Sequence, residues 1–115
     1  MNFKFENLEI YQKSLDFIEI IFTKTNKWPT IYLFNPTDQL KRAALSTALN
    51  IAEGSSRTRI EFKRFLSIAR GSCFECIPLI EIAFREKLIS TKTKEEWYNH
   101  CVSLAKMLSK LKSSL

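Results

Sequence analysis

The sequence QLKRAALSTALNIAEG, residues 39–54, has the pattern of a helix that is apolar over most of its circumference. One apolar face has the three- and four-residue spacing of a helix and contains Leu40, Ala43, Ala44, Thr47 and Ile51. A second face contains Leu45, Leu49 and Ala52. The polar residues left between them are Gln39, Arg42, Ser46, Asn50 and Glu53. Such a helix must lie mostly buried among others.

Residues typical of helix termini indicate where this helix begins and ends. Asn35-Pro36 is an N-cap residue followed by proline at the first helical position, so we expect the helix to start there. Gly54 is expected to end it, because glycine commonly follows the last helical turn.

A first helix is expected over residues 7–27, with Asn7 as its N-cap and Trp28-Pro29 as its stop. Its main apolar stripe contains Leu8, Tyr11, Leu15, Ile18 and Phe22. The adjoining flank contains Ile10, Phe17 and Ile21. Because the apolar arc covers roughly half the circumference, well beyond the ~100° of an ordinary surface helix, this helix needs two packing partners.

Two more helices follow the central one. The third is expected over residues 58–87, with Pro78 either kinking it or breaking it in two. The fourth is expected to begin with a capping box at Thr93 and Glu96 and to continue through Trp97 to Leu111. The connections are short, which makes neighbouring helices antiparallel.

Length and composition agree with a single small domain. The chain has 115 residues, a net charge of +6 and only two glycines, which disfavours folds that need many tight turns or a glycine-rich phosphate loop. We therefore predict one all-α domain over residues 1–115, an antiparallel up-down-up-down four-helix bundle. No secretion signal, membrane span or disulfide framework is expected, so we expect a cytoplasmic protein with reduced thiols.

Positive charge is concentrated between residues 41 and 70. This segment contains two acidic residues, Glu53 and Glu61, and seven basic ones. The basic residues are Lys41, Arg42, Arg57, Arg59, Lys63, Arg64 and Arg70. On the third helix Lys63 and Arg70 are expected on one flank of the core and Arg64 on the other, so one chain is not expected to form a single groove. No aromatic platform is expected beside these cations, because Phe62 and Phe65 fall on the core face.

The sequence contains no strong motif for catalysis or metal binding. The chain has four potential zinc ligands in Cys73, Cys76, His100 and Cys101. His100 and Cys101 point ~100° apart on their helix and rarely bind one ion together, so we interpret the cysteines as small core residues. The chain shows no nucleophile elbow, phosphate loop or metal-binding histidine pair. We therefore expect no enzyme activity, no cofactor and no metal.

The residues that fix the second and third helices resemble a known family. Gln39 to Ser46, Asn50-Ile51-Ala52-Glu53-Gly54 and the segment from Glu61 to Ser72 are similar to the 23S rRNA intervening-sequence proteins, and Phe5 to Ser14 resembles the start of that family. The resemblance implies an antiparallel four-helix bundle that assembles into a pentamer. It also implies a relationship to the accessory variability protein of diversity-generating retroelements, which binds nucleic acid and a reverse transcriptase.

Two functions follow as alternatives. The first is non-catalytic binding of RNA or DNA, in which the seven cations contact phosphates without reading the bases. The second is a protein-interaction scaffold in which these charges serve subunit contacts or a partner protein. Either way we expect a homo-oligomer, and its predicted interface residues are Ile10, Phe17, Ile21, Leu45, Leu49, Asn50 and Glu53. The polar stripe is expected to form a hydrogen-bonded network at that contact, with ligand binding or plain exposure as alternatives.

Overall fold

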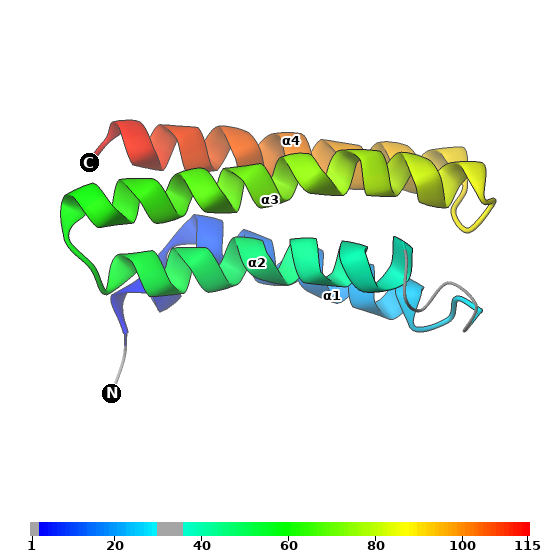
Figure 1. The fold of residues 1–115 in the computed structure, drawn as a ribbon, viewed down its shortest axis with the longest axis horizontal. Coiled ribbons are helices and arrows are strands. Elements are labelled where there is room, and N and C mark those ends of the chain that lie inside the picture. Colours follow the sequence, from blue (N-terminus) through cyan, green and yellow to red (C-terminus); the bar gives the residue numbers. More distant parts are fainter. Residues whose placement is uncertain (1–2, 30–35) are drawn as a thin grey trace.

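Four long helices lie side by side in the computed structural model, which describes residues 3–29 and 36–115 (Figure 1). They are α1 (Glu9–Thr25), α2 (Asp38–Ser55), α3 (Arg59–Arg85) and α4 (Thr91–Ser113), and a short 3-10 helix, η1 (Lys4–Asn7), precedes them. Successive helices are joined at alternate ends of the bundle, so each runs opposite to the one before it (Figure 1). The predicted all-α four-helix fold is confirmed.

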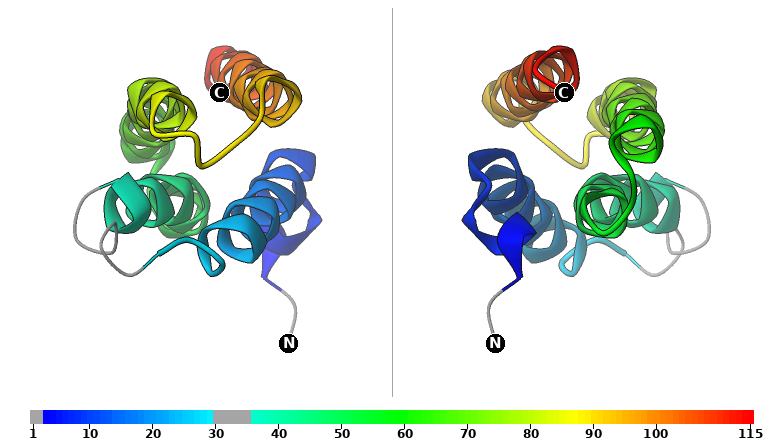
Figure 2. Two further views of the ribbon diagram at one scale, coloured as in Figure 1. Left: turned by 90° about the vertical axis from the view of Figure 1, so that its right-hand side faces the viewer. Right: turned by 90° about the vertical axis from the view of Figure 1, so that its left-hand side faces the viewer.

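The core lies along the axis around which the four helices are arranged when the bundle is viewed end on (Figure 2). Every helix contributes large side chains that are almost completely buried: Phe17, Ile21, Leu40, Ile51, Leu66, Ile80, Trp97, Leu104 and Leu108. Helix α3 packs most extensively, because it lies between α2 and α4.

The buried face of α1 differs from the expected one. The fully buried residues of this helix are Ile10, Ser14, Phe17, Ile21 and Thr25. The residues of the main apolar stripe predicted from the sequence are only half-buried, and they are Leu8, Tyr11, Leu15, Ile18 and Phe22. Asn7 is not the N-cap, because it belongs to η1 and α1 begins at Glu9.

Two small hydroxyl residues, Ser14 and Thr25, lie on the buried face of α1. The Ser14 hydroxyl donates to the Tyr11 carbonyl oxygen at 2.7 Å, and the Thr25 hydroxyl donates to that of Ile21 at 2.8 Å. Each polar group is thus satisfied within its own helix and can be buried at low cost. In the sequence these residues resemble solvent-facing positions, and they interrupt the apolar stripe that is in fact buried.

The prediction that α2 ends at Gly54 is wrong. The helix continues to Ser55, and neither glycine of the chain has a positive φ. A Cβ atom at Gly54 would lie 2.5 Å from the Cβ of Phe65 and 2.9 Å from Cδ1 of Phe62. Glycine therefore allows α2 and α3 to approach closely next to the turn that joins them. The expected N-cap of α2, Asn35, lies outside the described residues.

The boundaries of α3 and α4 are set by hydroxyl caps. Thr58 caps α3 in a capping box with Glu61, and α3 continues through Pro78 to Arg85. Of the two alternatives for Pro78, a kink or a break, the break is therefore excluded. Helix α4 begins at Thr91 with Ser90 as its N-cap, and the Ser90 hydroxyl accepts from the Thr93 backbone amide at 3.1 Å. The predicted capping box at Thr93 is therefore wrong, because the helix starts two residues earlier.

Candidate nucleic-acid interface

The predicted cations are divided between the two ends of the bundle. Lys41 and Arg42 lie in the first turns of α2, whereas Arg57, Arg59, Lys63 and Arg64 lie at the opposite end of that helix and in the first turns of α3. Roughly 20 Å of helix separates Arg42 from the last residue of α2. The seven cations therefore do not form one cluster in a single chain.

The two cations in the first turns of α2 have partners inside the protein. The Lys41 ammonium donates to Oδ1 of Asn26 at 2.9 Å and lies 5.2 Å from the ring centre of Phe22. Arg42 forms an ion pair with Asp38 at 2.9 Å. These contacts give both side chains a structural role in holding the start of α2.

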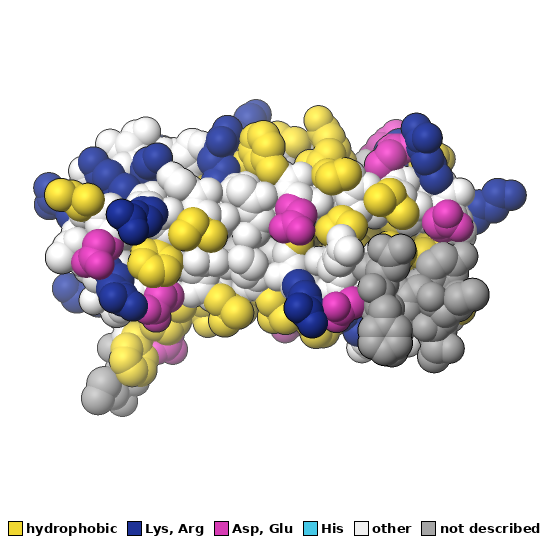
Figure 3. Space-filling view, in the orientation of Figure 1, with side chains coloured by type: hydrophobic (Ala, Val, Ile, Leu, Met, Phe, Trp, Pro, Cys, Tyr) yellow, Lys and Arg dark blue, Asp and Glu magenta, His cyan; other side chains and the backbone are white. Residues whose placement is uncertain are grey.

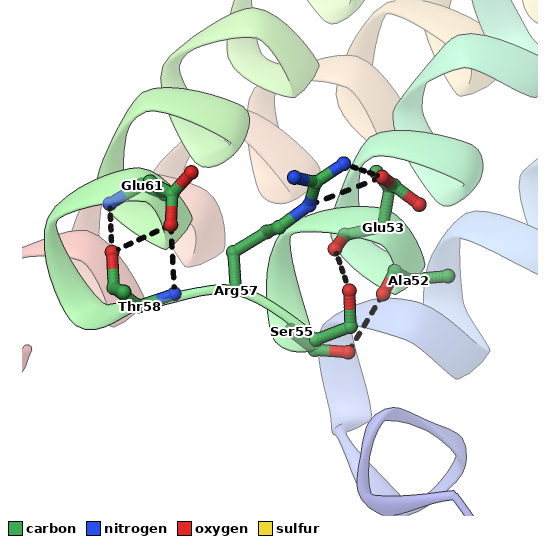
Figure 4. A network of polar contacts seen from close by, with 7 residues as sticks. Ala52, Glu53, Ser55, Arg57, Thr58 and Glu61 are labelled. Carbon is green, nitrogen blue, oxygen red and sulfur yellow. Dashed lines mark hydrogen bonds and ion pairs between the residues drawn. The ribbon is translucent and has the colours of Figure 1, made fainter.

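A network of polar contacts organises the turn between α2 and α3 (Figure 4). The Arg57 side chain reaches back to Glu53, with Nε 3.2 Å from Oε1, and this hydrogen bond raises the pKa of the guanidinium. Thr58 and Glu61 cap each other, since the Glu61 carboxylate accepts from the Thr58 amide at 3.2 Å and from its hydroxyl at 2.9 Å. The bonds from Thr58 lower the pKa of Glu61. Both carboxylates of this turn therefore have partners within the chain.

Beyond this turn, α3 and α4 form a groove lined by cations, which we call the basic groove. It is lined by Lys63, Ser67 and Arg70 of α3 and by Ser109, Lys112 and Ser113 of α4, with Leu66 and Leu108 at its floor, and it holds about 450 Å³. The Lys112 ammonium donates to the Ser67 hydroxyl at 2.7 Å and so bridges the two helices. No acidic side chain is among the described residues that line this basic groove. Figure 3 shows Lys and Arg side chains gathered at this end of the molecule.

The basic groove agrees with what was expected of the third helix. Lys63 and Arg70 lie on the same side of α3, because both line the groove, and Arg64 is not among its lining residues. The seven predicted cations therefore do not share one groove, and the opposite wall comes from α4 with Lys112. The cations near the end of α4 were not among the predicted site residues, and they are Lys106, Lys110 and Lys112. Applying the predicted antiparallel pairing of the last two helices would have placed them beside the start of α3.

A second, largely apolar groove continues from the first along α3 and α4. It holds about 600 Å³ and shares Arg70 and Ser109 with the basic groove. Its apolar walls are Phe74, Ile77, Pro78, Tyr98, Val102 and Ala105, and its charged residues are Arg70 and Lys106. Phe74 is 55% exposed and Tyr98 is 49% exposed. The expectation of no aromatic platform considered only Phe62 and Phe65, whereas the exposed ring of Phe74 lies beside the cation Arg70.

The predicted oligomer interface falls into two groups. Ile10, Phe17 and Ile21 are buried in the core of a single chain, so their assignment to a subunit contact is wrong: they have no surface left to offer. On α2, Leu49 is 63% exposed and Glu53 is exposed, whereas Leu45 and Asn50 are half-buried.

The polar stripe of α2 forms its hydrogen bonds within the chain. The Asn50 amide donates to the Ser46 carbonyl oxygen at 2.7 Å and to the Ser46 hydroxyl at 3.0 Å. That hydroxyl in turn accepts from the Ser72 hydroxyl of α3 at 2.7 Å. Ser46 therefore joins α2 to α3 through Ser72, and Asn50 forms its hydrogen bonds to Ser46 within α2.

The interpretation of the cysteines as core residues is confirmed, because Cys73, Cys76 and Cys101 are buried free thiols. Burial raises the pKa of Cys73 to about 11, and a hydrogen bond with Cys101 together with burial raises the pKa of Cys76. The ring of His100 lies 5.6 Å from that of Phe17. Within residues 3–29 and 36–115, no three metal-ligating side chains gather in a way that could hold an ion.

Hydropathy gives one further finding: none of the helices formed by the described residues has the length and apolar character needed to cross a membrane.

Comparison with known proteins agrees with this fold. The sequence profile of the 23S rRNA-intervening sequence protein family matches residues 6–110. The chain is also similar to the crystal structure of a protein of unknown function from the S23 ribosomal protein family of Bacteroides thetaiotaomicron. The TM-score is 0.80 with 23% identity, over 90% of this chain and 95% of that one. No curated protein matches the chain. Because the family profile covers nearly the whole sequence, the chain belongs to the 23S rRNA-intervening sequence protein family.

Proposed function

We propose that this protein is a non-catalytic module that binds RNA or DNA through the basic groove. The supporting observation is the charge of that groove, where Lys63, Arg70 and Lys112 face a common space with no acidic side chain among its lining residues. Arg59 and Arg64 are exposed nearby on α3 and form no ion pair with any described residue. Cations fixed on helices and free of carboxylates bind phosphates and release counterions. Contacts of this kind position a nucleic acid but do not read its sequence.

The test is fluorescence anisotropy with labelled structured RNA and duplex DNA at low and moderate salt. Wild-type protein is expected to bind both, with an affinity that falls steeply as salt rises. The double variant Arg59→Glu/Lys63→Glu should abolish binding. Its matched control is Arg42→Glu/Arg85→Glu, which changes net charge equally but alters ion-paired residues far from the groove. Equal loss in both variants would reduce the effect to net charge, and no binding at low salt would refute the proposal.

Assembly into a homo-oligomer, a pentamer by family resemblance, is part of the same proposal. Repetition around an axis would set several basic grooves side by side and multiply their contacts with one nucleic acid. Leu49 supports a contact through the outer face of α2, because a leucine 63% exposed beside half-buried Leu45 is available to a second copy. Leu49→Asp should lower the mass measured by light scattering, whereas Ile82→Asp, at another exposed apolar position, should not.

The alternative is a protein-interaction scaffold. Ile60 favours it, because this side chain is 82% exposed between Arg59 and Glu61 in the first turn of α3. An isolated exposed isoleucine is common on protein surfaces, so it weighs less than the basic groove. The scaffold becomes the better interpretation if the wild-type protein binds neither RNA nor DNA at low salt.

A further inference from the structure

We propose that the apolar groove between α3 and α4 binds single-stranded nucleic acid, with bases stacked on Phe74 and Tyr98 and phosphates held by Arg70 and Lys106. This inference rests on the proposed function and specifies it, because it names unpaired strands as the preferred partner.

The first argument is the position of the two aromatic side chains. Phe74 belongs to α3 and Tyr98 to α4, and both line the groove while remaining about half exposed. Aromatic side chains contribute a large apolar surface, and here about half of that surface is open to solvent among the described residues. A nucleobase is a flat apolar surface that stacks on such rings, whichever base it is. The groove of about 600 Å³ is large enough to admit one or two bases.

The second argument is the charge around these rings. The Arg70 guanidinium carbon lies over the Phe74 ring, 4.6 Å from its centre, so a cation is in direct contact with one face of this aromatic side chain. Lys106 lines the same groove from α4. Strand binders combine aromatic rings with cations in this way, because each nucleotide presents a base and a phosphate together.

The third argument is continuity with the basic groove. The two grooves share Arg70 and Ser109, so a strand whose bases lie at Phe74 and Tyr98 can continue toward Lys63 and Lys112. All four charged residues that line the combined groove are cations: Lys63, Arg70, Lys106 and Lys112. This uniform charge favours an anionic strand. A duplex cannot use the aromatic part, because its base faces are hidden in the stack.

The test measures anisotropy of the full-length protein with three labelled probes of equal length: oligothymidine, an abasic strand and duplex DNA. Wild-type protein should bind oligothymidine most tightly, because the abasic strand keeps the phosphates but has no base to stack. Phe74→Ala/Tyr98→Ala should weaken oligothymidine binding about tenfold or more and leave duplex binding nearly unchanged. The matched control is Ile82→Ala, which truncates another exposed apolar residue of α3 that does not line the groove.

A second variant makes the test independent of truncation. Tyr98→Trp keeps an aromatic ring in the groove, and its emission should be quenched by oligothymidine but not by the abasic strand. Circular dichroism confirms that each variant keeps its helices, which is expected because both side chains are exposed.

The possible results separate the two proposals. If oligothymidine and the abasic strand bind equally, or the double variant keeps full affinity for oligothymidine, the groove assignment is overturned while phosphate binding at the basic groove stands. If no probe binds, both proposals are overturned. If the double variant instead lowers the mass of the protein in solution, a second copy covers the groove and the assignment is again overturned.

Discussion

The two ends of the bundle are both rich in charge but use it differently. At the end where α3 turns into α4, the Glu81 carboxylate pairs with Arg85 at 2.8 Å and with Lys94 at 2.7 Å. At the end where α2 turns into α3, Arg57 pairs with Glu53, but Arg59, Lys63 and Arg64 form no ion pair with a described residue. At the α3–α4 end one carboxylate thus pairs with two cations, whereas at the α2–α3 end Arg59, Lys63 and Arg64 are left available to an outside anion.

The α2–α3 end is also the more tightly constrained one. Its connection is shorter, its helices approach closely at Gly54, and its N-cap is a reciprocal capping box. The α3–α4 end has a longer turn, with Lys87 at a φ of 62°, and a single hydroxyl cap at Ser90. Cations on a rigid frame lose little freedom when they bind an anion, so the tighter end is better suited to binding.

Breaking the close helix approach should have the largest effect on stability. Gly54→Ala places a Cβ atom 2.5 Å from the Cβ of Phe65, which can move only with the α3 backbone. Overpacking of this kind is expected to lower the free energy of unfolding by about 1–3 kcal/mol. The control is Gly71→Ala, where no atom lies within 4 Å and the gain in helix propensity should raise stability by about 0.5–1 kcal/mol. Urea denaturation measures both, and changes of the same sign would contradict the role given to Gly54.

Removing the helix caps compares the two ends directly. Thr58→Ala should lower the free energy of unfolding by about 1 kcal/mol. Ser90→Ala should cost somewhat less, because Ser90 lacks the reciprocal carboxylate that Glu61 supplies to Thr58. Thermal unfolding of the two variants gives the order, and a larger loss in Ser90→Ala would show that the α3–α4 end is the better capped of the two.

Arginine removal should have a smaller effect and differ between the ends. Arg85→Ala breaks an exposed pair with Glu81 and should cost about 0.2–0.5 kcal/mol in urea denaturation. Arg59→Ala should leave stability almost unchanged, because this side chain has no ion-pair partner among the described residues. A loss as large as that of Arg85→Ala would mean that Arg59 is engaged within the chain.

The smallest expected effect concerns how acid and salt act on two carboxylates. Bonds from Thr58 lower the pKa of Glu61, and contacts with Lys94 and Arg85 lower the pKa of Glu81. A lowered folded pKa means that the stabilisation is present above the unfolded value, near 4.5, and is lost as pH falls through the folded value. High salt should bring the pKa of Glu81 back toward its ordinary range more than that of Glu61, because salt screens ion pairs but not a capping box. Carboxylate NMR titration at low and high salt measures this, and equal responses would contradict the distinction.

The sequence predicted the number of helices well because apolar periodicity and short connections are local signals. It did not predict which face of α1 is buried. Ser14 and Thr25 lie on that face, and their hydroxyls donate to backbone carbonyl oxygens of the same helix. An apolar arc of half a circumference leaves several orientations open, and only packing against α2 and α4 selects one.

The candidate site was harder to predict because it is built from segments far apart in the chain. Lys63 and Lys112 share a groove only because α3 and α4 pair antiparallel. Phe74 follows buried Cys73 and precedes exposed Glu75, so its exposure depends on a rotation of α3 that periodicity does not fix to within one residue. The family resemblance gave the fold and did not supply these contacts.

The buried thiols have a practical consequence for labelling. Burial raises the pKa of Cys73 to about 11, which disfavours its thiolate at pH 7, and all three cysteines are buried. Maleimide reagents should therefore leave the native protein unmodified. A cysteine introduced at exposed Lys110 would then be a unique attachment point for a dye, and the natural sequence would need no other change.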